Sequence, residues 1–402
     1  MIESTHAPST LDFSFGEFGT RILEGTEVKA IAVLTRVGPD QGKIVGVING
    51  TNSFKLFRLD KEGLLDTTFG PDGTGYSEDR FGAPGSFSTP STLTIVNDDQ
   101  ILVTGHVRDS SLAPHYPAVA LFNGNGSANL VFGKFKFDVP PPSPPQATTS
   151  LSTSATITDA VKILVSFNNS APGPCQHWGL VLQLTLDGKL DTALDGRGYI
   201  FFRYKGQDTS TVGVAAQVSG RIVLAGSTAD QGFIAGYTST GQPDPTFGKE
   251  GGITAFSSSE GPVRVTRLLL QTDDRLIAVG AIAKGDSGWV TRKLRDGTDD
   301  ISFNDGKDVI SKIAFRKLRW SSAVIDPEGS IVMAGEVDTR LTVVGRITRD
   351  GQIDTSFSTT GLSNPNAEHT PHQLSDVGVQ TTSRIVVVGR KTNQPSVTRY
   401  HG

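Results

Sequence analysis

The chain has 402 residues, of which 36% are hydrophobic and 19% charged, with 46 Gly and 21 Pro. This composition is typical of a turn-rich all-β protein and excludes a disordered one. The net charge of -4 gives no sign of the basic surface that binds nucleic acid. No apolar run reaches the roughly 18 residues of a membrane span. Segment 1–10 is polar and lacks the apolar core of a standard cleaved signal peptide, so a cytoplasmic location stays open. Cys175 is the single cysteine, so packing alone is expected to hold the fold.

A six-residue pattern, read as L-D-T-T-F-G at Leu65–Gly70, recurs in graded form. Its seven copies lie at Leu11–Gly16, Leu65–Gly70, Ala128–Gly133, Leu190–Asp195, Pro243–Gly248, Asp299–Asn304 and Ile353–Ser358. The copies are roughly 57 residues apart, and a fixed period of this size indicates a repeat architecture. Units this short cannot each bury a core, so they must pack on one another.

Each unit is predicted to contain four strands. In chain order these are exemplified by Ala30–Leu34, Lys43–Ile48, Phe54–Leu59 and the segment after Gly70. The second strands are nearly continuous apolar runs, typical of strands covered on both faces. They lie at Lys43–Ile48, Gln100–Gly105, Lys162–Phe167, Arg221–Gly226, Arg275–Gly280, Ser330–Gly335 and Arg384–Gly389. In the third strands, apolar and polar residues alternate more regularly than in the second strands, which predicts that the third strands lie nearer solvent. Fourth strands follow the repeated pattern, at Thr20–Leu23, Tyr199–Phe202, Ile253–Phe256 and Val309–Ile313.

Four-stranded antiparallel units repeated radially form a β-propeller. The predicted fold is therefore all-β, a seven-bladed β-propeller of four-stranded antiparallel blades. The chain ends after a third strand, Ser396–His401, and begins with a fourth strand, Thr20–Leu23. We expect this N-terminal strand to complete the last blade, which closes the ring and removes two exposed sheet edges. The expected domain is residues 11–402, after an N-terminal extension of residues 1–10, and the expected state is a monomer.

The repeated pattern has a structural interpretation. Its Asp follows a tight turn, where the carboxylate can accept backbone N–H bonds. Its Phe is expected to be an apolar anchor between neighbouring blades, and its Gly permits a bend with positive φ. Cation binding by the Asp is the alternative, but the carboxylates lack the alternating spacing of a calcium loop.

The pattern L-D-x-x-F-G-x-x-G, followed about 25 residues later by β-branched runs that end in Gly, resembles the bacterial delta-60 repeat family. The likeness covers Leu11 to Tyr400 and departs most where Leu194 and Asp195 replace Phe-Gly. The resemblance implies a β-propeller, in a protein that is secreted or on the cell surface. It concerns scaffold residues, so it implies no particular ligand.

The loops fall into two classes that should lie on opposite faces of the disc. Short turns join the first strand to the second and the third to the fourth; we call their side the short-turn face. Long connections join the second strand to the third and each unit to the next; we call their side the long-loop face. Binding residues usually lie on long loops of a rigid scaffold. The candidate ligand-binding residues there are His106, Arg108, His115, Tyr116, His177, Trp178, Trp289, His369 and His372.

Three interpretations of these residues remain open. Polar residues gather in loops without any ligand, or the residues line a small-ligand or glycan site, or His106, His115 and His177 hold a metal, which would need three or four converging ligands. Cys175 beside His177 is a weaker candidate nucleophile, because a lone cysteine is usually inert. The sequence also lacks G-x-S-x-G, H-E-x-x-H, C-x-x-C and a Walker loop. No catalytic residue, metal site or cofactor is therefore assigned.

The preferred hypothesis is a non-enzymatic recognition module that binds a glycan or a protein partner through the long-loop face. One alternative is a propeller hydrolase or lyase with its site at the mouth of the central channel. The other is a structural component of a secreted or surface complex.

Overall fold

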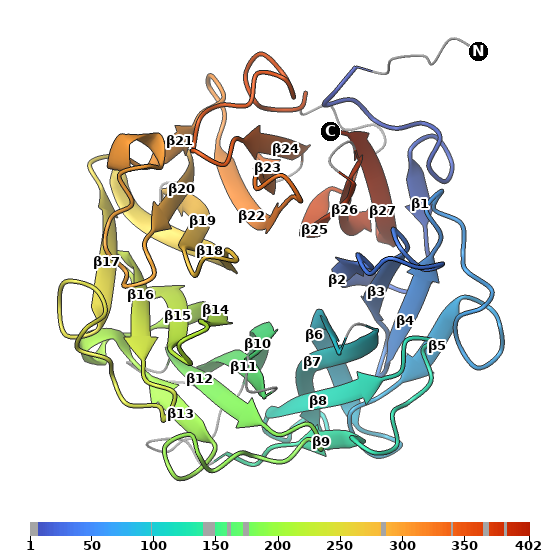
Figure 1. The fold of residues 1–402 in the computed structure, drawn as a ribbon. Coiled ribbons are helices and arrows are strands. Elements are labelled where there is room, and N and C mark those ends of the chain that lie inside the picture. The colour runs from blue at the N-terminus through green and yellow to red at the C-terminus, as the bar shows by residue number, and fades with distance from the viewer. Residues whose placement is uncertain are drawn as a thin grey trace.

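The computed structural model describes residues 7–97, 99–139, 149–158, 162–171, 177–282, 287–338, 341–364, 370–381 and 384–402. These residues form an all-β propeller whose blades are antiparallel and mostly four-stranded (Figure 1). Two short 3-10 turns, η1 (Tyr204–Gly206) and η2 (Asn304–Gly306), are the helical elements of the described residues.

The strands form six hydrogen-bonded sheets in the described part of the chain. Three sheets of four strands follow one another along the chain: β2 (Glu27–Val33), β3 (Ile44–Asn49), β4 (Phe54–Leu59) and β5 (Tyr76–Asp79); β6 (Phe87–Val96), β7 (Gln100–Arg108), β8 (Tyr116–Phe122) and β9 (Lys134–Lys136); β10 (Thr149–Ile157), β11 (Ile163–Ser170), β12 (His177–Leu184) and β13 (Tyr199–Phe202).

An eight-stranded sheet contains β14 (Ser210–Ala216), β15 (Ile222–Ser227), β16 (Gly232–Tyr237), β17 (Ile253–Ser258), β18 (Gly261–Leu270), β19 (Leu276–Ile282), β20 (Gly288–Lys293) and β21 (Val309–Ser311). A three-stranded sheet contains β22 (Leu318–Ile325), β23 (Ile331–Val337) and β24 (Leu341–Ile347). The last sheet contains β25 (Gln373–Thr381), β26 (Arg384–Lys391), β27 (Gln394–His401) and, from the other end of the chain, β1 (Thr20–Ile22).

The sheets are arranged around a central opening, with the first strand of each unit innermost (Figure 1). The N-terminal strand β1 pairs antiparallel with β27, and Thr20 lies opposite Thr398. Leu11 forms a further bridge to Tyr400. The two ends of the chain therefore share one sheet.

The core lies between neighbouring sheets. Phe54 of β4, for example, packs against Phe81 at a ring-centroid distance of 4.8 Å and against Phe122 of β8 at 6.0 Å. Because sheets cover both faces of their neighbours, β16 and β20 are buried at every residue. The prediction that third strands lie nearer solvent is therefore wrong: their alternation does not correspond to a solvent-facing side.

A β-bulge interrupts the pairing of each innermost strand with its neighbour. In β18, for example, the register shifts between Val265 and Arg267. The opposing residue in β19 is Gly280, where a Cβ atom would lie 1.9 Å from the carbonyl oxygen of Arg264. The glycine that ends this β-branched run is thus required by the close approach of the bulged strand. Gly105, Gly226, Gly335 and Gly389 meet the same constraint from the corresponding carbonyls.

The Asp of the repeated pattern accepts a backbone N–H bond, as expected, but the donor lies two residues further along the pattern and not in the preceding tight turn. Asp66 Oδ1 accepts the N–H and the hydroxyl of Thr68 at 3.0 and 2.7 Å. Its Oδ2 accepts a hydrogen bond from Arg58 Nε at 2.7 Å, and that arginine was not anticipated. The same carboxylate–arginine pair recurs for Asp244, Asp300, Asp354 and Asp12, with Arg221, Arg292, Arg346 and Arg399. The carboxylates therefore neutralise arginines, which argues against the cation-binding alternative.

The Phe of the pattern anchors one unit on the next, as predicted. Phe15, Phe69 and Phe247 are fully buried, and their rings lie directly against Gly63, Gly126 and Gly297 in the short turns of the following units. The glycines that follow the Phe, Gly16, Gly70, Gly133 and Gly248, all have positive φ.

The sixth repeat departs from the predicted four strands. Beside β24, the described residues form isolated bridges from Gly345 to Leu362 and from Ile347 to Ile353 and no further strand. The N–H of Arg346 donates to Gly361 O at 2.9 Å, and Ser363 N–H donates to Val344 O at 2.8 Å. A fourth strand is thus reduced to a few backbone contacts at this position.

Candidate functional site

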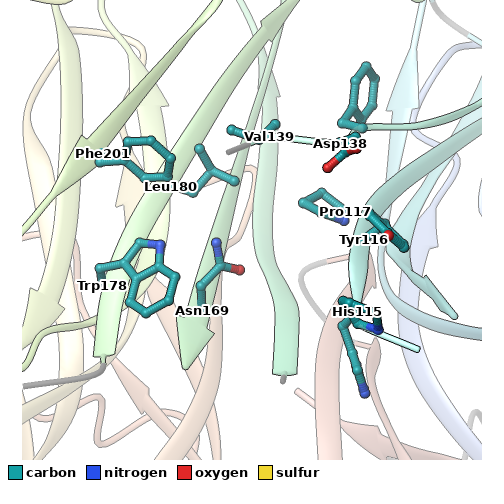
Figure 2. A pocket seen from close by; sticks show the side chains of 11 residues that line it. His115, Tyr116, Pro117, Asp138, Val139, Asn169, Trp178, Leu180 and Phe201 are labelled. Carbon is teal, nitrogen blue, oxygen red and sulfur yellow. The ribbon is translucent and has the colours of Figure 1, made fainter. Parts of the chain in front are cut away.

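A narrow cleft opens on the long-loop face between the β6–β9 sheet and the β10–β13 sheet. Its volume is about 30 Å³. Figure 2 shows Asn169, Trp178, Leu180 and Phe201 on one wall and His115, Tyr116, Pro117, Asp138 and Val139 on the other. Pro114 and Phe137 complete the lining.

The first wall is built by the β11–β12 hairpin. Asn169 and Trp178 are directly opposite in its register, so their side chains share one face of the sheet. Both are buried, with exposed fractions of 4% and 2%. Asn169 Oδ1 and Trp178 Nε1 nevertheless make no hydrogen bond to any described residue. One acceptor and one donor therefore lie unsatisfied at the same cleft, an arrangement that costs about 1–3 kcal/mol per group.

The second wall carries His115, at the end of the connection that leads into β8. Its ring stacks on that of His106 in β7, with centroids 4.5 Å apart and an interplanar angle of 30°. Burial lowers the pKa of His115, and the positive charge of Arg108 lowers it further, so the imidazole is neutral at neutral pH. His115 Nδ1 is buried and has no hydrogen-bond partner in the described structure. Asp138 adds an exposed carboxylate to this wall.

The structure brings together only some of the predicted site residues. His115, Tyr116 and Trp178 line the cleft, and buried His106 supports it through the ring stack. Arg108 Cζ instead lies 5.2 Å from the ring centroid of Phe87.

The remaining predicted residues lie outside the cleft. His177 is exposed and begins β12, where its N–H donates to Asp208 Oδ1 at 3.0 Å. His372 precedes β25 in another sheet. Trp289 is fully buried, and its Nε1 donates to Asp308 Oδ2 at 2.8 Å. This tryptophan is a core residue, because the sheets that flank β20 cover its face, and its assignment to a ligand-binding loop face was wrong. His369, Cys175 and residues 140–146 of the Pro-rich connection lie outside the described residues.

Asn169 and Asp138 were missed at the sequence level. Asn169 lies beyond the predicted strand Lys162–Phe167, in a segment expected to be loop, whereas in the structure this strand, β11, continues to Ser170. Asp138 could not be found from the sequence either, because it follows the short strand β9 and reaches the cleft from the neighbouring sheet.

The described residues contain no group of three or more His, Cys, Asp or Glu side chains that could hold a metal ion. His177 does not join the stacked pair of His106 and His115 at the cleft. Within the described ranges, no helix has the length and apolar character needed to cross a bilayer. The lining of the cleft itself presents hydrogen-bonding groups and aromatic rings.

Comparison with known proteins supports the fold. Residues 42–69 match a family model described as a domain of unknown function (DUF5122) beta-propeller. No curated protein matches the chain. Among solved structures, prolyl oligopeptidase B from Galerina marginata is similar at 13% identity and a TM-score of 0.50, over 94% of this chain and 49% of that chain.

Two other solved structures that match are similarly distant in sequence. The Dos1 propeller has 11% identity and a TM-score of 0.48, over 95% of this chain and 93% of that chain. Drosophila Semaphorin 1b, extracellular domains 1-2, has 8% identity and a TM-score of 0.48, over 94% and 87%. Together, the family-model match over residues 42–69 and the antiparallel four-stranded sheets support a β-propeller fold for this chain.

Proposed function

We propose that this protein is a non-enzymatic recognition module that binds a glycan through the cleft on its long-loop face. The observation that supports the proposal is the pair of buried, unsatisfied groups on one wall, Trp178 Nε1 and Asn169 Oδ1. A ligand hydroxyl can accept from the indole and donate to the amide oxygen at once. Saccharides present such hydroxyls in abundance.

The size of the cleft limits which chemical group of a ligand can enter it. A volume of about 30 Å³ admits roughly two water-sized groups. An exocyclic hydroxymethyl arm has this size, while a whole sugar ring does not. The ring would therefore rest at the mouth, beside Tyr116 and Asp138. Burial of an otherwise unsatisfied donor and acceptor against one hydroxyl gives the specificity, since a deoxy analogue would leave both groups unpaired.

The test is binding of the full-length protein to a glycan panel, followed by titration of the best binder and its deoxy analogue. Trp178→Phe removes the indole N–H and keeps an aromatic ring, and Asn169→Ala removes the acceptor. We expect either variant to weaken binding about tenfold or more. Trp320→Phe is the matched control, because Trp320 Nε1 is also buried and unsatisfied but lies away from the cleft. Silence across the panel, or equal binding by all variants, would contradict the proposal. If the protein binds a protein partner and no glycan, the module has a recognition role but its ligand is a protein.

We also propose that the ring contains seven blades, is closed by β1 and forms one domain over residues 11–402. Seven copies of the repeated pattern support this count. The eight-stranded sheet would then be two blades joined at the β17–β18 hairpin, which pairs through only Ser257–Pro262 and Ser258–Gly261. An experimental density map that shows another number of blades would contradict the proposal.

A further inference from the structure

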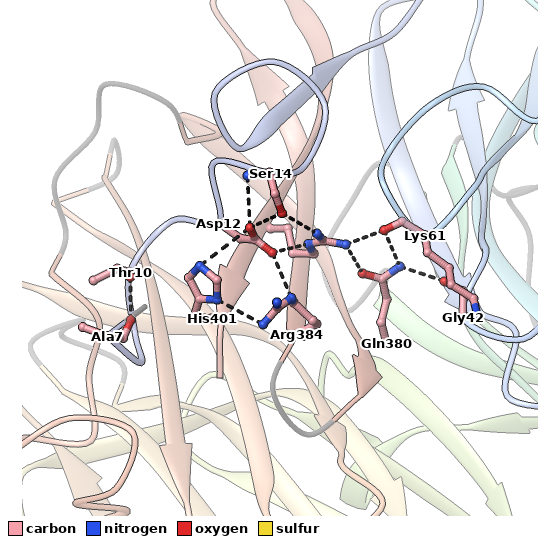
Figure 3. A network of polar contacts seen from close by, with 10 residues as sticks. Ala7, Thr10, Asp12, Ser14, Gly42, Lys61, Gln380, Arg384 and His401 are labelled. Carbon is pink, nitrogen blue, oxygen red and sulfur yellow. Dashed lines mark hydrogen bonds and ion pairs between the residues drawn. The ribbon is translucent and has the colours of Figure 1, made fainter. Parts of the chain in front are cut away.

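A second cavity lies on the short-turn face, where the two ends of the chain meet; we call it the seam groove. Its volume is about 520 Å³. The residues that matter are Ser14 from the N-terminal segment, Lys61 and Glu62 from the turn between β4 and β5, and Gln380, Arg384 and Arg399 from the last sheet. Figure 3 shows the polar network in its floor.

One buried carboxylate serves two arginines in this floor. Asp12, which is 1% exposed, has its Oδ2 2.9 Å from Arg384 Nε and 2.8 Å from Arg399 Nε. Its Oδ1 accepts the N–H and the hydroxyl of Ser14 at 3.1 and 2.6 Å. Lys61 and Glu62 lie at the rim. Three cations thus face two carboxylates, and one positive charge remains in excess.

Gln380 and Arg399 also donate hydrogen bonds across the groove, and these bonds hold its walls together. Gln380 Nε2 donates to Gly42 O at 2.7 Å and to Lys61 O at 3.4 Å. Arg399 Nη1 donates to Lys61 O and to Gln380 Oε1. These contacts join the last sheet to the β2–β5 sheet. The charged groups of the groove come from the N-terminal segment, the β4–β5 turn and the last sheet.

The corresponding groove between the β2–β5 sheet and the β6–β9 sheet provides a natural comparison. Its volume is about 430 Å³, and Arg58 occupies the place that Arg399 has in the seam groove. There, with the floor carboxylate and its partners counted in the same way, Arg36, Lys43 and Arg58 face Asp40, Asp66 and Asp99, so the charges balance. The excess positive charge is therefore a property of the seam groove and is not imposed by the repeat.

We propose that the seam groove binds a small anion through an oxyanion group, a carboxylate or a phosphate. Arg384, about one-third exposed, and the exposed Lys61 supply the charge, and Gln380 and Ser14 flank the site. Guanidinium and ammonium groups pair with such oxyanions through charge-assisted hydrogen bonds. Because these side chains come from both ends of the chain, the bound anion links the N-terminal segment and the β2–β5 sheet to the last sheet. Anion binding therefore stabilises the folded ring by mass action.

The experiment is thermal unfolding of the full-length protein in inorganic phosphate and in citrate, each compared with sodium chloride at equal ionic strength and pH. We expect a rise in the unfolding midpoint of about 2 °C or more at anion concentrations tenfold above Kd. A comparison of phosphate with citrate shows whether the groove prefers a phosphate or a carboxylate. Lys61→Gln and Arg384→Gln should each abolish most of this rise, whatever their effect on stability in chloride.

Two charge-matched controls make the result specific. Lys189→Gln removes a positive charge from a distant short turn, where Lys189 pairs with Asp187, and Arg36→Gln removes one from the balanced groove. Both should keep the full rise. An equal rise in all variants would identify general ionic stabilisation and overturn the proposal, as would the absence of any rise beyond chloride. If Arg384→Gln fails to fold, Lys61→Gln alone decides, because its side chain is exposed.

Discussion

The cleft on the long-loop face and the seam groove on the short-turn face differ in how buried polar groups are satisfied. At the seam, Asp12 accepts hydrogen bonds from Ser14, Arg384 and Arg399. At the cleft, Trp178 Nε1 and Asn169 Oδ1 are buried and have no partner among the described residues. A satisfied network contributes to the stability of the fold, while unsatisfied groups are costly unless a ligand or water meets them. This difference is the reason why the glycan site is proposed at the cleft, while the anion proposed at the seam would add to a network that is already paired.

The largest expected effect is the loss of the N-terminal strand. Deletion of residues 1–22 removes β1 and Asp12, which leaves the outer edge of β27 unpaired and Arg399 without its carboxylate. We expect the truncated protein to unfold at a much lower temperature or to aggregate. Differential scanning calorimetry would measure this, with deletion of residues 1–6 as the control. Equal midpoints for the two truncations would show that the pairing does not stabilise the ring.

A smaller effect is expected from the seam carboxylate alone. Asp12→Ala leaves two guanidinium groups without their shared partner and should cost about 3 kcal/mol of the free energy of unfolding. Asp354→Ala removes the partner of one arginine, Arg346, and should cost about 2 kcal/mol. Urea titrations of both variants and the wild type would show which variant loses more free energy of unfolding. A larger loss for Asp354→Ala would show that the carboxylate shared by two arginines is not more stabilising than a single pair.

Acid should weaken the short-turn face through its carboxylates. Burial acts to raise the pKa of Asp300, but hydrogen bonds from Ser302 and Arg292 and the charge of Arg292 outweigh it and hold the pKa below its ordinary value. Because the pKa is lower in the folded state, the stabilisation is complete above the unfolded pKa of about 4 and is lost as pH falls below it. We expect the stability difference between the wild type and Asp300→Asn to narrow from about pH 5 to about pH 2. Urea titrations across this range would measure it, and a constant difference would contradict the assignment.

The smallest effect concerns two tryptophans. Trp289→Phe removes a hydrogen bond to Asp308 and should cost about 2 kcal/mol more than the accompanying loss of ring volume. Trp178→Phe removes an indole N–H that has no partner, so its cost should be confined to the lost volume. Chemical denaturation of the two variants would compare them. Equal costs would indicate that Trp178 Nε1 is satisfied in solution and would weaken the case for the cleft.

Much of the scaffold was predictable because its signals are local. The fourth strand Tyr199–Phe202 was predicted with the bounds observed for β13. The positive φ of Gly70 and the burial of Phe69 also followed from the pattern. The arginines that pair with most of the Asp residues of the pattern were missed, although Arg58, Arg292 and Arg346 precede their partners by eight residues. Such a separation corresponds to two adjacent strands, and only a predicted register could have joined them.

The candidate site was less accessible from sequence. His115, Tyr116 and Trp178 were predicted and line the cleft, but Trp289 belongs to the core. An aromatic residue at the start of a strand can face a ligand or a neighbouring sheet, and its sequence neighbours do not distinguish the two. Asn169 and Asp138 meet at the cleft from different sheets, so no local pattern connects them.

By itself, the sequence determined the repeat, the strand order of each unit and the chemistry of its turns, because hydrophobic periodicity and turn propensity act over a few neighbouring residues. The tertiary structure alone decided which side chains from distant units meet. Arg399 and Asp12 are 387 residues apart, and the two walls of the cleft come from separate sheets. Such contacts depend on how the sheets pack against one another, since packing sets which buried polar groups find a partner and which stay without one.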